Sequence, residues 1–279
     1  LIVKLLLDLD SKLVDKFPLL PKPISYKEGI EFNAHLHADG EQMLFVGEHK
    51  SGYAIFYKKL EGATAKLITK IGSRAAYPKW LTSIDDTFVF SDVNEEGVCQ
   101  IFKSSVDKPE IKDVMSSCVG NAGVEVFVNQ IANSIYWYDV SGIWTQSLVS
   151  EERTLLPFGI QEIKYQMLSP DDKLWAGLKL SGENSILSIY RLEDKSLVFE
   201  KVIPYEISHF KWAKDSSAIY HLGEHPANQL FELGLNGEQA LLATTSFGTM
   251  TQISDVQTDN TIEFVISSVD LDVYSFEDS

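Results

Sequence analysis

Six histidines and two cysteines are the side chains of this sequence that could serve metal binding, ligand binding or redox bonding. His35 and His37 alternate with Leu36 in EFNAHLHADG, so on a β-strand both imidazoles would project to the same side. His209, in ISHFKWA, stands in a comparable segment. These imidazoles could bind a ligand, or they could pack as hydrogen-bonded residues beneath a turn. Two histidines alone make a weak ligand set, so we predict no bound metal and no cofactor.

The triplet Gly-Glu-His occurs twice, in VGEH at 46–49 and in LGEH at 222–225. The two copies lie 176 residues apart, which is four times 44, and this indicates a repeat of about 44 residues. A repeat of this length would place His49 and His225 on one rim of the fold. They could share a metal or anion there, or each triplet could be a polar turn that glycine closes well.

The two cysteines, Cys99 and Cys118, are close enough in sequence for a disulfide. In a repeat of four strands, the loop beside Cys99 and the connection that carries Cys118 emerge on the same face. A bridge closing a loop of roughly 20 residues would stabilise the fold by about 3 kcal/mol and would imply an oxidising compartment such as the periplasm. Two free buried thiols, and a cytoplasmic location, are the alternative.

The repeat that must position these side chains is visible in its turns. Each unit has a turn signal followed at once by a short apolar run: ADGEQMLF (38–45), SIDDTFVF (83–90), IANSIYWY (131–138), SPDDKLWA (169–176), AKDSSAIY (213–220) and QTDNTIEF (257–264). Asp, Asn and Ser side chains accept backbone hydrogen bonds in such turns, and glycine takes positive φ. Two further apolar runs follow each turn and one precedes it, so each unit predicts four antiparallel strands, the length and strand count of a propeller blade.

We therefore predict an all-β, six-bladed β-propeller that forms a single domain over residues 1–279. The expected blades cover about 25–70, 71–115, 116–158, 159–203, 204–246 and 247–279. The last unit contains three strand candidates (250–256, 261–267 and 271–277), and a segment within 1–24 is expected to add the missing strand and close the ring. The alternatives are a β-sandwich for the whole chain and an amphipathic helix for the N-terminal segment.

Composition limits the function. With 24 basic and 40 acidic residues the chain carries a net charge of −16, which argues against direct nucleic-acid binding. No apolar run reaches the length of a transmembrane helix. The apolar opening at Leu1, without an initiator Met, leads us to expect a processed protein or a piece of a longer one with an anchor upstream. HExxH, GxSxG and P-loop patterns are absent, so we predict that the chain is not an enzyme.

One aromatic residue stands apart from the apolar strands. Trp144 lies in the polar stretch VSGIWTQS, where it could anchor a protein partner on one face of the propeller. The other tryptophans are close to the turns and are expected to pack between blades. Acidic loop residues such as Asp92 and Glu183 are expected to form a solvated face.

The turn at 169–173, Ser-Pro-Asp-Asp-Lys, and less fully the turn at 38–42, resemble the Ser-Pro-Asp-Gly-Lys hairpin of TolB-type propeller repeats. This resemblance implies WD40-like four-stranded blades and a role in contacting other molecules. Similar proteins include TolB, the propeller domains of prolyl-oligopeptidase-like peptidases, and the extracytoplasmic domains of membrane-bound winged-helix regulators of the CadC and ToxR type. We accordingly expect a sensing or protein-interaction propeller, with a TolB-like scaffold and a propeller hydrolase or lyase as alternatives.

Overall fold

The chain folds entirely into β-structure over the residues that the computed structural model describes. These are residues 2–5, 22–23, 31–49, 52–62, 64–70, 77–81, 86–94, 96–110, 112–119, 123–129, 133–156, 163–223, 228–245, 249–256 and 262–267. Within these ranges all regular secondary-structure elements are β-strands. No described segment forms a helix with the length and apolar character needed to cross a bilayer.

Five blades are each built from four consecutive strands. Blade 1 has β3 (Glu31–Leu36), β4 (Gln42–His49), β5 (Gly52–Lys59) and β6 (Lys66–Lys70). Blade 2 has β7 (Lys79–Trp80), β8 (Thr87–Val93), β9 (Cys99–Ser105) and β10 (Asp113–Ser117). Blade 3 has β11 (Val126–Asn129), β12 (Ser134–Asp139), β13 (Gly142–Ser147) and β14 (Arg153–Leu156). Blade 4 has β15 (Tyr165–Leu168), β16 (Leu174–Ser181), β17 (Asn184–Arg191) and β18 (Leu197–Ile203). Blade 5 has β19 (Ile207–Trp212), β20 (Ala218–Gly223), β21 (Gln229–Gly234) and β22 (Gln239–Thr244).

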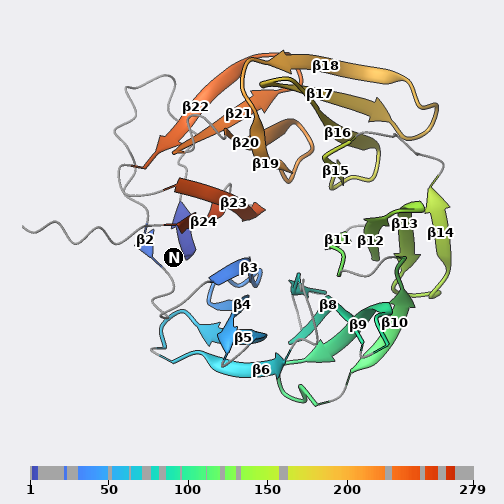
Figure 1. Ribbon diagram of the computed structural model, residues 1–279, viewed down its shortest axis with the longest axis vertical. Coiled ribbons are helices and arrows are strands. Elements are labelled where there is room, and N and C mark those ends of the chain that lie inside the picture. The colour runs from blue at the N-terminus through green and yellow to red at the C-terminus, as the bar shows by residue number, and fades with distance from the viewer. Residues whose placement is uncertain are drawn as a thin grey trace, which may run out of the picture.

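A further sheet combines the two ends of the chain. We call it the composite sheet, and its strand order is β2 (Lys22–Pro23), β1 (Ile2–Leu5), β24 (Ile262–Ser267) and β23 (Thr249–Val256). β1 pairs antiparallel with β24, with Ile2 opposite Val265 and Leu5 opposite Ile262. Figure 1 shows the sheets arranged around a centre, with β6, β10, β14, β18 and β22 at the outside.

The prediction of six blades needs correction. Over the described residues the chain forms five continuous blades, and the remaining sheet is not a sixth unit of the same kind. The C-terminal part of the chain contributes two described strands to this sheet, β23 and β24, whereas three were expected. The N-terminal part contributes two, β1 and β2, whereas one was expected. The third C-terminal candidate, 271–277, lies outside the described residues. The physical reason for the composite arrangement is that β24 would otherwise present an unpaired row of N–H and C=O groups, which β1 pairs.

The hairpin between the first and second strands has the same form in blades 1, 4 and 5. Gly40 N donates to His37 O at 2.9 Å, Asp172 N donates to Ser169 O at 3.0 Å, and Ser216 N donates to Ala213 O at 3.0 Å. Each donor residue has positive φ: 71° for Gly40, 55° for Asp172 and 64° for Ser216. Each hairpin has four residues between the last paired positions, which are 37 and 42, 169 and 174, and 213 and 218. The third loop residue is left-handed, and Gly, Asp and short polar residues tolerate that conformation better than bulky side chains.

The hydrophobic core lies between the faces of neighbouring sheets. One cluster joins blades 3, 4 and 5 and includes Phe127, Trp175, Leu187, Phe210 and Ile219. Other clusters join blades 1 and 2, blades 2 and 3, and blade 5 with the composite sheet. Because successive residues of a strand point to opposite faces, a blade packed on both sides needs apolar residues at consecutive positions. β8 and β20 accordingly show almost continuous burial.

Candidate functional site

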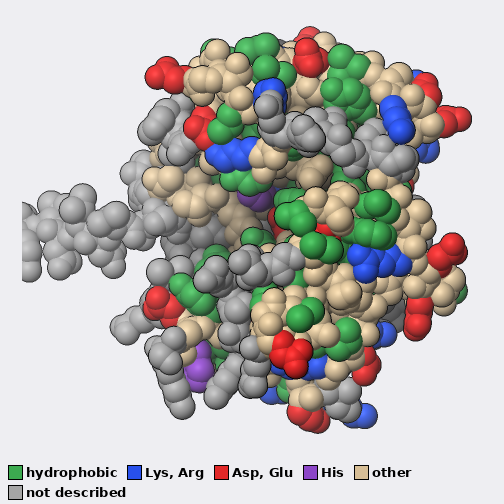
Figure 2. Space-filling view, turned by 45° about the vertical axis from the view of Figure 1, so that its right-hand side comes forward, with side chains coloured by type: hydrophobic (Ala, Val, Ile, Leu, Met, Phe, Trp, Pro, Cys, Tyr) green, Lys and Arg blue, Asp and Glu red, His purple; other side chains and the backbone are tan. Residues whose placement is uncertain are grey.

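Two lysines from opposite sides of the ring meet at one glutamate near its centre. Lys211 Nζ lies 3.1 Å from Glu125 Oε1, and Lys79 Nζ lies 3.9 Å from the same oxygen. Lys79 belongs to blade 2 and Lys211 to blade 5, with two sheets between them in either direction around the ring, while Glu125 directly precedes blade 3. We call Lys79, Glu125 and Lys211 the axial cluster. Figure 2 shows a hollow near the middle of one face, with histidine and acidic side chains visible in it.

The axial lysines are fixed by the tryptophan that follows each of them. Lys79-Trp80 and Lys211-Trp212 are the same dipeptide at the same place in the first strand of blades 2 and 5. The Trp212 indole N–H donates to the carbonyl of Met167 at 3.2 Å, and the Trp80 indole N–H donates to the carbonyl of His35 at 3.2 Å. Each tryptophan is therefore attached to the preceding blade, and the alternation of the strand turns the neighbouring lysine away from that interface.

Electrostatics keep the carboxyl group of Glu125 ionised. Burial alone would raise the pKa of Glu125, but Lys211 and Lys79 lower the pKa of this carboxyl below its ordinary value. Burial, assisted by Lys211, lowers the pKa of His209 to about 3, so this imidazole stays neutral and adds no positive charge. Burial and the charge of Glu125 raise the pKa of Tyr77 to about 12 and raise that of Tyr138 further. Both phenols therefore keep their protons and remain hydrogen-bond donors.

The histidines predicted near the axis instead join sheets to one another. His35 Nδ1 accepts the backbone N–H of Trp80 at 3.2 Å, and His209 Nδ1 accepts the backbone N–H of Ile253 at 3.3 Å. His37 is buried, with its Nδ1 2.9 Å from Asp39 and its ring packed edge-on against Trp80 at 5.0 Å. His209 also lies in the electrostatic field of the axial cluster. The described residues contain no group of three or more His, Cys, Asp or Glu side chains that could hold a metal ion.

Of the two Gly-Glu-His histidines, the structure describes His49. His49 ends β4 and is half-buried, with its ring 6.4 Å from that of Phe56. His225 lies outside the described residues, so the predicted pairing with His49 stays a prediction.

Cys99 and Cys118 are joined by a disulfide, with their Cα atoms 5.1 Å apart. The bridge places Val98, which is 41% exposed, beside Val119, which is 49% exposed. The backbone N–H of Val119 donates to Asp139 Oδ2 at 2.9 Å, and Asp139 precedes Val140, which is 84% exposed. Val98, Val119 and Val140 are therefore three exposed valines at the same end of blades 2 and 3. We call these three residues the valine face.

Trp144, predicted as an aromatic anchor for a partner, lies next to the valine face and makes contacts within its own blade. It stacks on the fully buried Trp137 with ring centroids 6.5 Å apart, and the guanidinium carbon of Arg153 lies 3.7 Å from its ring centroid. Its indole N–H donates to Ser141 Oγ at 2.8 Å. The contacts of this tryptophan within its own blade hold the loop that presents Val140.

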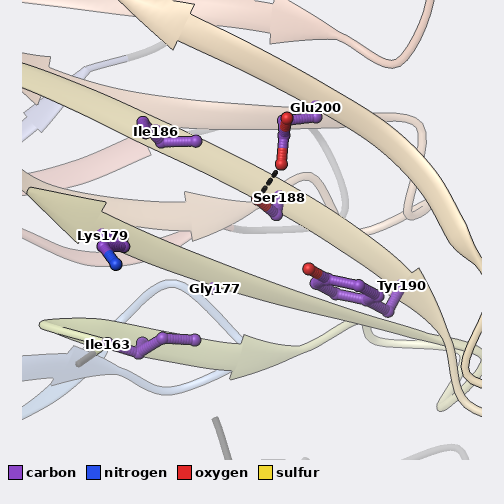
Figure 3. A pocket seen from close by; sticks show the side chains of 7 residues that line it. All are labelled: Ile163, Gly177, Lys179, Ile186, Ser188, Tyr190 and Glu200. Carbon is purple, nitrogen blue, oxygen red and sulfur yellow. Dashed lines mark hydrogen bonds between the residues drawn. The ribbon is translucent and has the colours of Figure 1, made fainter. Parts of the chain in front are cut away.

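Blade 4 carries a second concave feature, a pocket of about 240 Å³ on one face of its sheet (Figure 3). It is lined by Ile163, Gly177, Lys179, Ile186, Ser188, Tyr190 and Glu200. Figure 3 shows the Tyr190 ring on one side and Lys179 on the other, and Ser188 Oγ donates to Glu200 Oε2 at 2.9 Å. Gly177 is needed here because a Cβ at this position would lie 2.6 Å from both Ile163 Cδ1 and Trp175 Cη2.

Sequence reasoning missed the axial cluster, although one signal for it was present. The dipeptide Lys-Trp occurs at 79–80 and 211–212, a separation of 132 residues, or three repeats of 44. That spacing places both lysines on equivalent strands. Glu125, in contrast, precedes its strand as a single acidic residue without a counterpart, so only the structure reveals it.

Comparison with known proteins shows the fold. No protein-family model and no curated protein sequence match this chain. TolB from Acinetobacter baumannii has a similar structure, with a TM-score of 0.63 and 13% sequence identity over 82% of this chain and 57% of that one. A putative TolB from Agrobacterium tumefaciens gives a TM-score of 0.67 and 12% identity over 95% of this chain and 96% of that one. An oligogalacturonate lyase from Vibrio parahaemolyticus gives 0.56 and 13% over 85% and 70%.

This chain thus spans little more than half the length of the Acinetobacter TolB chain. At such low identities the likeness shows a TolB-like β-propeller fold, as the turn sequences indicated, and says nothing further about activity.

Proposed function

We propose that this chain is a non-catalytic interaction propeller that works in an extracytoplasmic compartment and binds a protein partner through the valine face. The observation that carries the proposal is the grouping of three exposed valines at one end of neighbouring blades. Exposed apolar patches mark interaction sites when they are contiguous and held in place. The disulfide and the Asp139 hydrogen bond hold this one.

The disulfide also supports the proposed compartment. Disulfides persist in secreted and periplasmic proteins and are rare in the cytosol, where thiols are kept reduced. Cys99 is fully buried and Cys118 nearly so, which protects the bridge from exchange.

The positions of the histidines support a non-catalytic role. A general base must present an unshared nitrogen to a substrate. His35 and His209 each use a ring nitrogen to accept a backbone N–H from a neighbouring sheet, and His37 faces Asp39. These imidazoles therefore contribute to the assembly of the ring.

In its finer form, the proposal is that the propeller is the sensing domain of a membrane-anchored transcription regulator of the CadC or ToxR type. A TolB-like scaffold without a link to transcription is the alternative form. The reading frame of the natural protein separates them. A transcription regulator of this type requires a winged helix and a membrane segment in the same chain. If the reading frame lacks either one, the TolB-like scaffold is the function that remains.

The valine face can be tested with a photo-crosslinking side chain placed at Val140 or, as a matched control, at Val149. Both valines are about equally exposed, at 84% and 80%, but Val149 lies in the β13–β14 turn, which leaves the blade on the opposite face. In cells of the natural host, we expect one discrete adduct from position 140 and none from position 149. Val119→Asp should abolish that adduct.

Equal crosslinking from both positions, or an adduct that survives Val119→Asp, would remove the valine face as the interaction surface. The compartment has its own test. Alkylation of Cys99 and Cys118 by a thiol reagent in intact cells would show that they are reduced and would contradict an extracytoplasmic location.

A second candidate function is that of a propeller lyase. It is favoured by the structural similarity to two oligogalacturonate lyases, one of which was determined in complex with manganese. Its test is an assay for unsaturated products from oligogalacturonate with added manganese. Under the interaction proposal we expect no product above the uncatalysed rate.

A further inference from the structure

We propose that the outer edge of β18 is a second interaction surface, at which an extended basic segment of a partner protein adds to blade 4 as a further strand. A lysine or arginine of that segment would place its cation against Glu200 and its aliphatic stem over the blade 4 pocket. This inference goes beyond the proposed function, because it assigns a partner chemistry to a surface on a different blade from the valine face.

β18 is the outer strand best suited to pair with another chain. Each of the five blades ends in an outer strand with no further strand beside it in the sheet order, and Figure 1 shows these strands at the rim. β18 has seven residues, whereas the outer strands of the other blades have four to six. Of the described residues, Leu197, Val198 and Val202 are exposed large hydrophobics on β18, and each of the other four outer strands has one.

An edge of this kind is a template for strand addition. Every second residue of an outer strand turns its N–H and C=O away from the sheet, and proteins usually protect such edges with lysines or bulges. The one lysine of β18, Lys201, donates from Nζ to the carbonyl of Gly237 at 2.7 Å, so its charge is held toward blade 5. The register shifts once, near the start of the strand, and residues 199–203 pair regularly with β17. This regular stretch is long enough to pair with a short strand.

The blade 4 pocket borders this edge and supplies a negative charge. Glu200 of β18 is exposed, and its Oε2 accepts the hydroxyl of Ser188 at 2.9 Å. Over the described part of the chain, no cation lies within ion-pair distance of this carboxylate. Figure 3 shows the Glu200 carboxylate and the Tyr190 hydroxyl turned toward the middle of the lining residues. Lys179 lies on β16, two strands from the edge, so Glu200 is the pocket charge nearest to an added strand.

These features favour a basic partner. A strand added to β18 would lie about 4.8 Å from it, so a lysine or arginine opposite Glu200 can form a cross-strand ion pair. Ile186 and Tyr190 offer apolar surface to the stem of such a long side chain. The whole chain carries −16, so a basic segment is also attracted at longer range. Main-chain hydrogen bonds and one side-chain pocket are the usual means by which a sheet edge recognises a peptide.

Strand addition can be tested with a fluorescein-labelled peptide, Thr-Val-Thr-Lys-Thr-Val-Thr, whose binding is measured by fluorescence anisotropy. Two N-methylated forms carry methyl groups on alternate residues, one form on the odd positions and the other on the even positions. Only alternate N–H groups of an added strand face β18. We therefore expect one form to lose binding and the other to bind like the parent peptide.

The charge is tested with Glu200→Gln, which should fold because Glu200 is exposed. It should weaken binding of the lysine peptide about fivefold and leave unchanged the binding of a peptide with norleucine in place of lysine. Glu193→Gln is the matched control, because it removes an exposed carboxylate from the turn between β17 and β18. It should change neither affinity.

Three results would overturn the inference: no binding of the lysine peptide, the same response to both N-methylated forms, or equal effects of Glu200→Gln and Glu193→Gln. A second copy of this chain is the other occupant of the edge, and we expect the protein to sediment as a monomer. A dimer that Val202→Lys dissociates would assign the edge to self-association instead and would also overturn the inference. The valine-face crosslink reports separately on the proposed function.

Discussion

Trp80 and His35, 45 residues apart, are joined by two hydrogen bonds across the boundary between blades 1 and 2. The backbone N–H of Trp80 donates to His35 Nδ1, and its indole N–H donates to the His35 carbonyl, each at 3.2 Å. The indole N–H of Trp212 likewise donates to the carbonyl of Met167, also 45 residues earlier. The repeat length of the sequence is therefore also the spacing of the bonds that join one blade to the next.

The indole bonds should contribute measurably to stability. Trp212→Phe keeps an aromatic ring but removes the donor to Met167, which leaves that buried carbonyl without this partner. We expect the free energy of unfolding in urea to fall by about 1–3 kcal/mol. Trp144→Phe is the matched control, because its indole bonds to a solvent-exposed serine hydroxyl. A loss as large for Trp144→Phe as for Trp212→Phe would contradict a special role for the inter-blade bond.

The regular parts of the fold were predictable because their causes are local. Gly40, Asp172 and Ser216 occupy the same left-handed position of the same hairpin, and the sequence shows a turn-forming residue at each. The composite sheet was not predictable in detail. The pairing of β1 with β24 joins residues about 260 positions apart, and no local pattern specifies how many strands each end supplies.

The disulfide should stabilise the ring chiefly by constraining the unfolded chain. Its cysteines are 19 residues apart, and closing a loop of this size is worth about 3 kcal/mol in the chain-entropy model. We expect the double variant Cys99→Ser/Cys118→Ser to lose about that much in urea unfolding, and the wild-type protein to lose a similar amount when reductant is present. An effect of reductant on the double variant would show that the loss does not arise from the bridge.

The protein should lose stability in acid because of a buried histidine. Burial, with a smaller effect of Lys201, lowers the pKa of His221 from 6.5 to about 3. Between these values the unfolded chain binds a proton that the folded protein does not, so the free energy of unfolding falls as pH decreases, by at most about 1.4 kcal/mol per pH unit. Above pH 6.5 the contribution is constant.

His221→Phe removes that proton while keeping an aromatic ring stacked on Phe231, which lies 5.3 Å away. Urea unfolding measured at about pH 5 and about pH 7 should therefore show a smaller loss for the variant than for the wild-type protein. The same loss in both proteins would mean that His221 is protonated in the folded state.

Gly177 should be intolerant of even one methyl group. Alanine here would place a Cβ 2.6 Å from Ile163 and from Trp175, so the side-chain packing on this face of blade 4 must shift. Such overpacking costs about 1–3 kcal/mol. Gly52→Ala is the control, because a Cβ there meets no atom within 4 Å, and it should change stability by less than about 0.5 kcal/mol. Equal thermal unfolding of both variants would contradict the close contact at Gly177.

The candidate site was only partly foreseeable. The number and spacing of the cysteines indicated a possible disulfide. The repeated Lys-Trp dipeptides indicated that the axial lysines occupy equivalent strands. The histidines were chosen as candidates because imidazole can bind metals and transfer protons. Their observed hydrogen bonds depend instead on which neighbouring sheet lies opposite each ring. The roles of Glu125 and of the valine face depend on contacts between different blades, which no local sequence pattern specifies.

The central claim is that one carboxylate holds the lysine of blade 5 at the middle of the ring, and a double-mutant cycle on Lys211 and Glu125 tests it most directly. The free energy of unfolding is measured for the wild-type protein, Lys211→Met, Glu125→Gln and the double variant. We predict a coupling energy of about 1–3 kcal/mol, with the double variant losing less than the sum of the two single losses. Additive losses, within about 0.5 kcal/mol, would contradict the account.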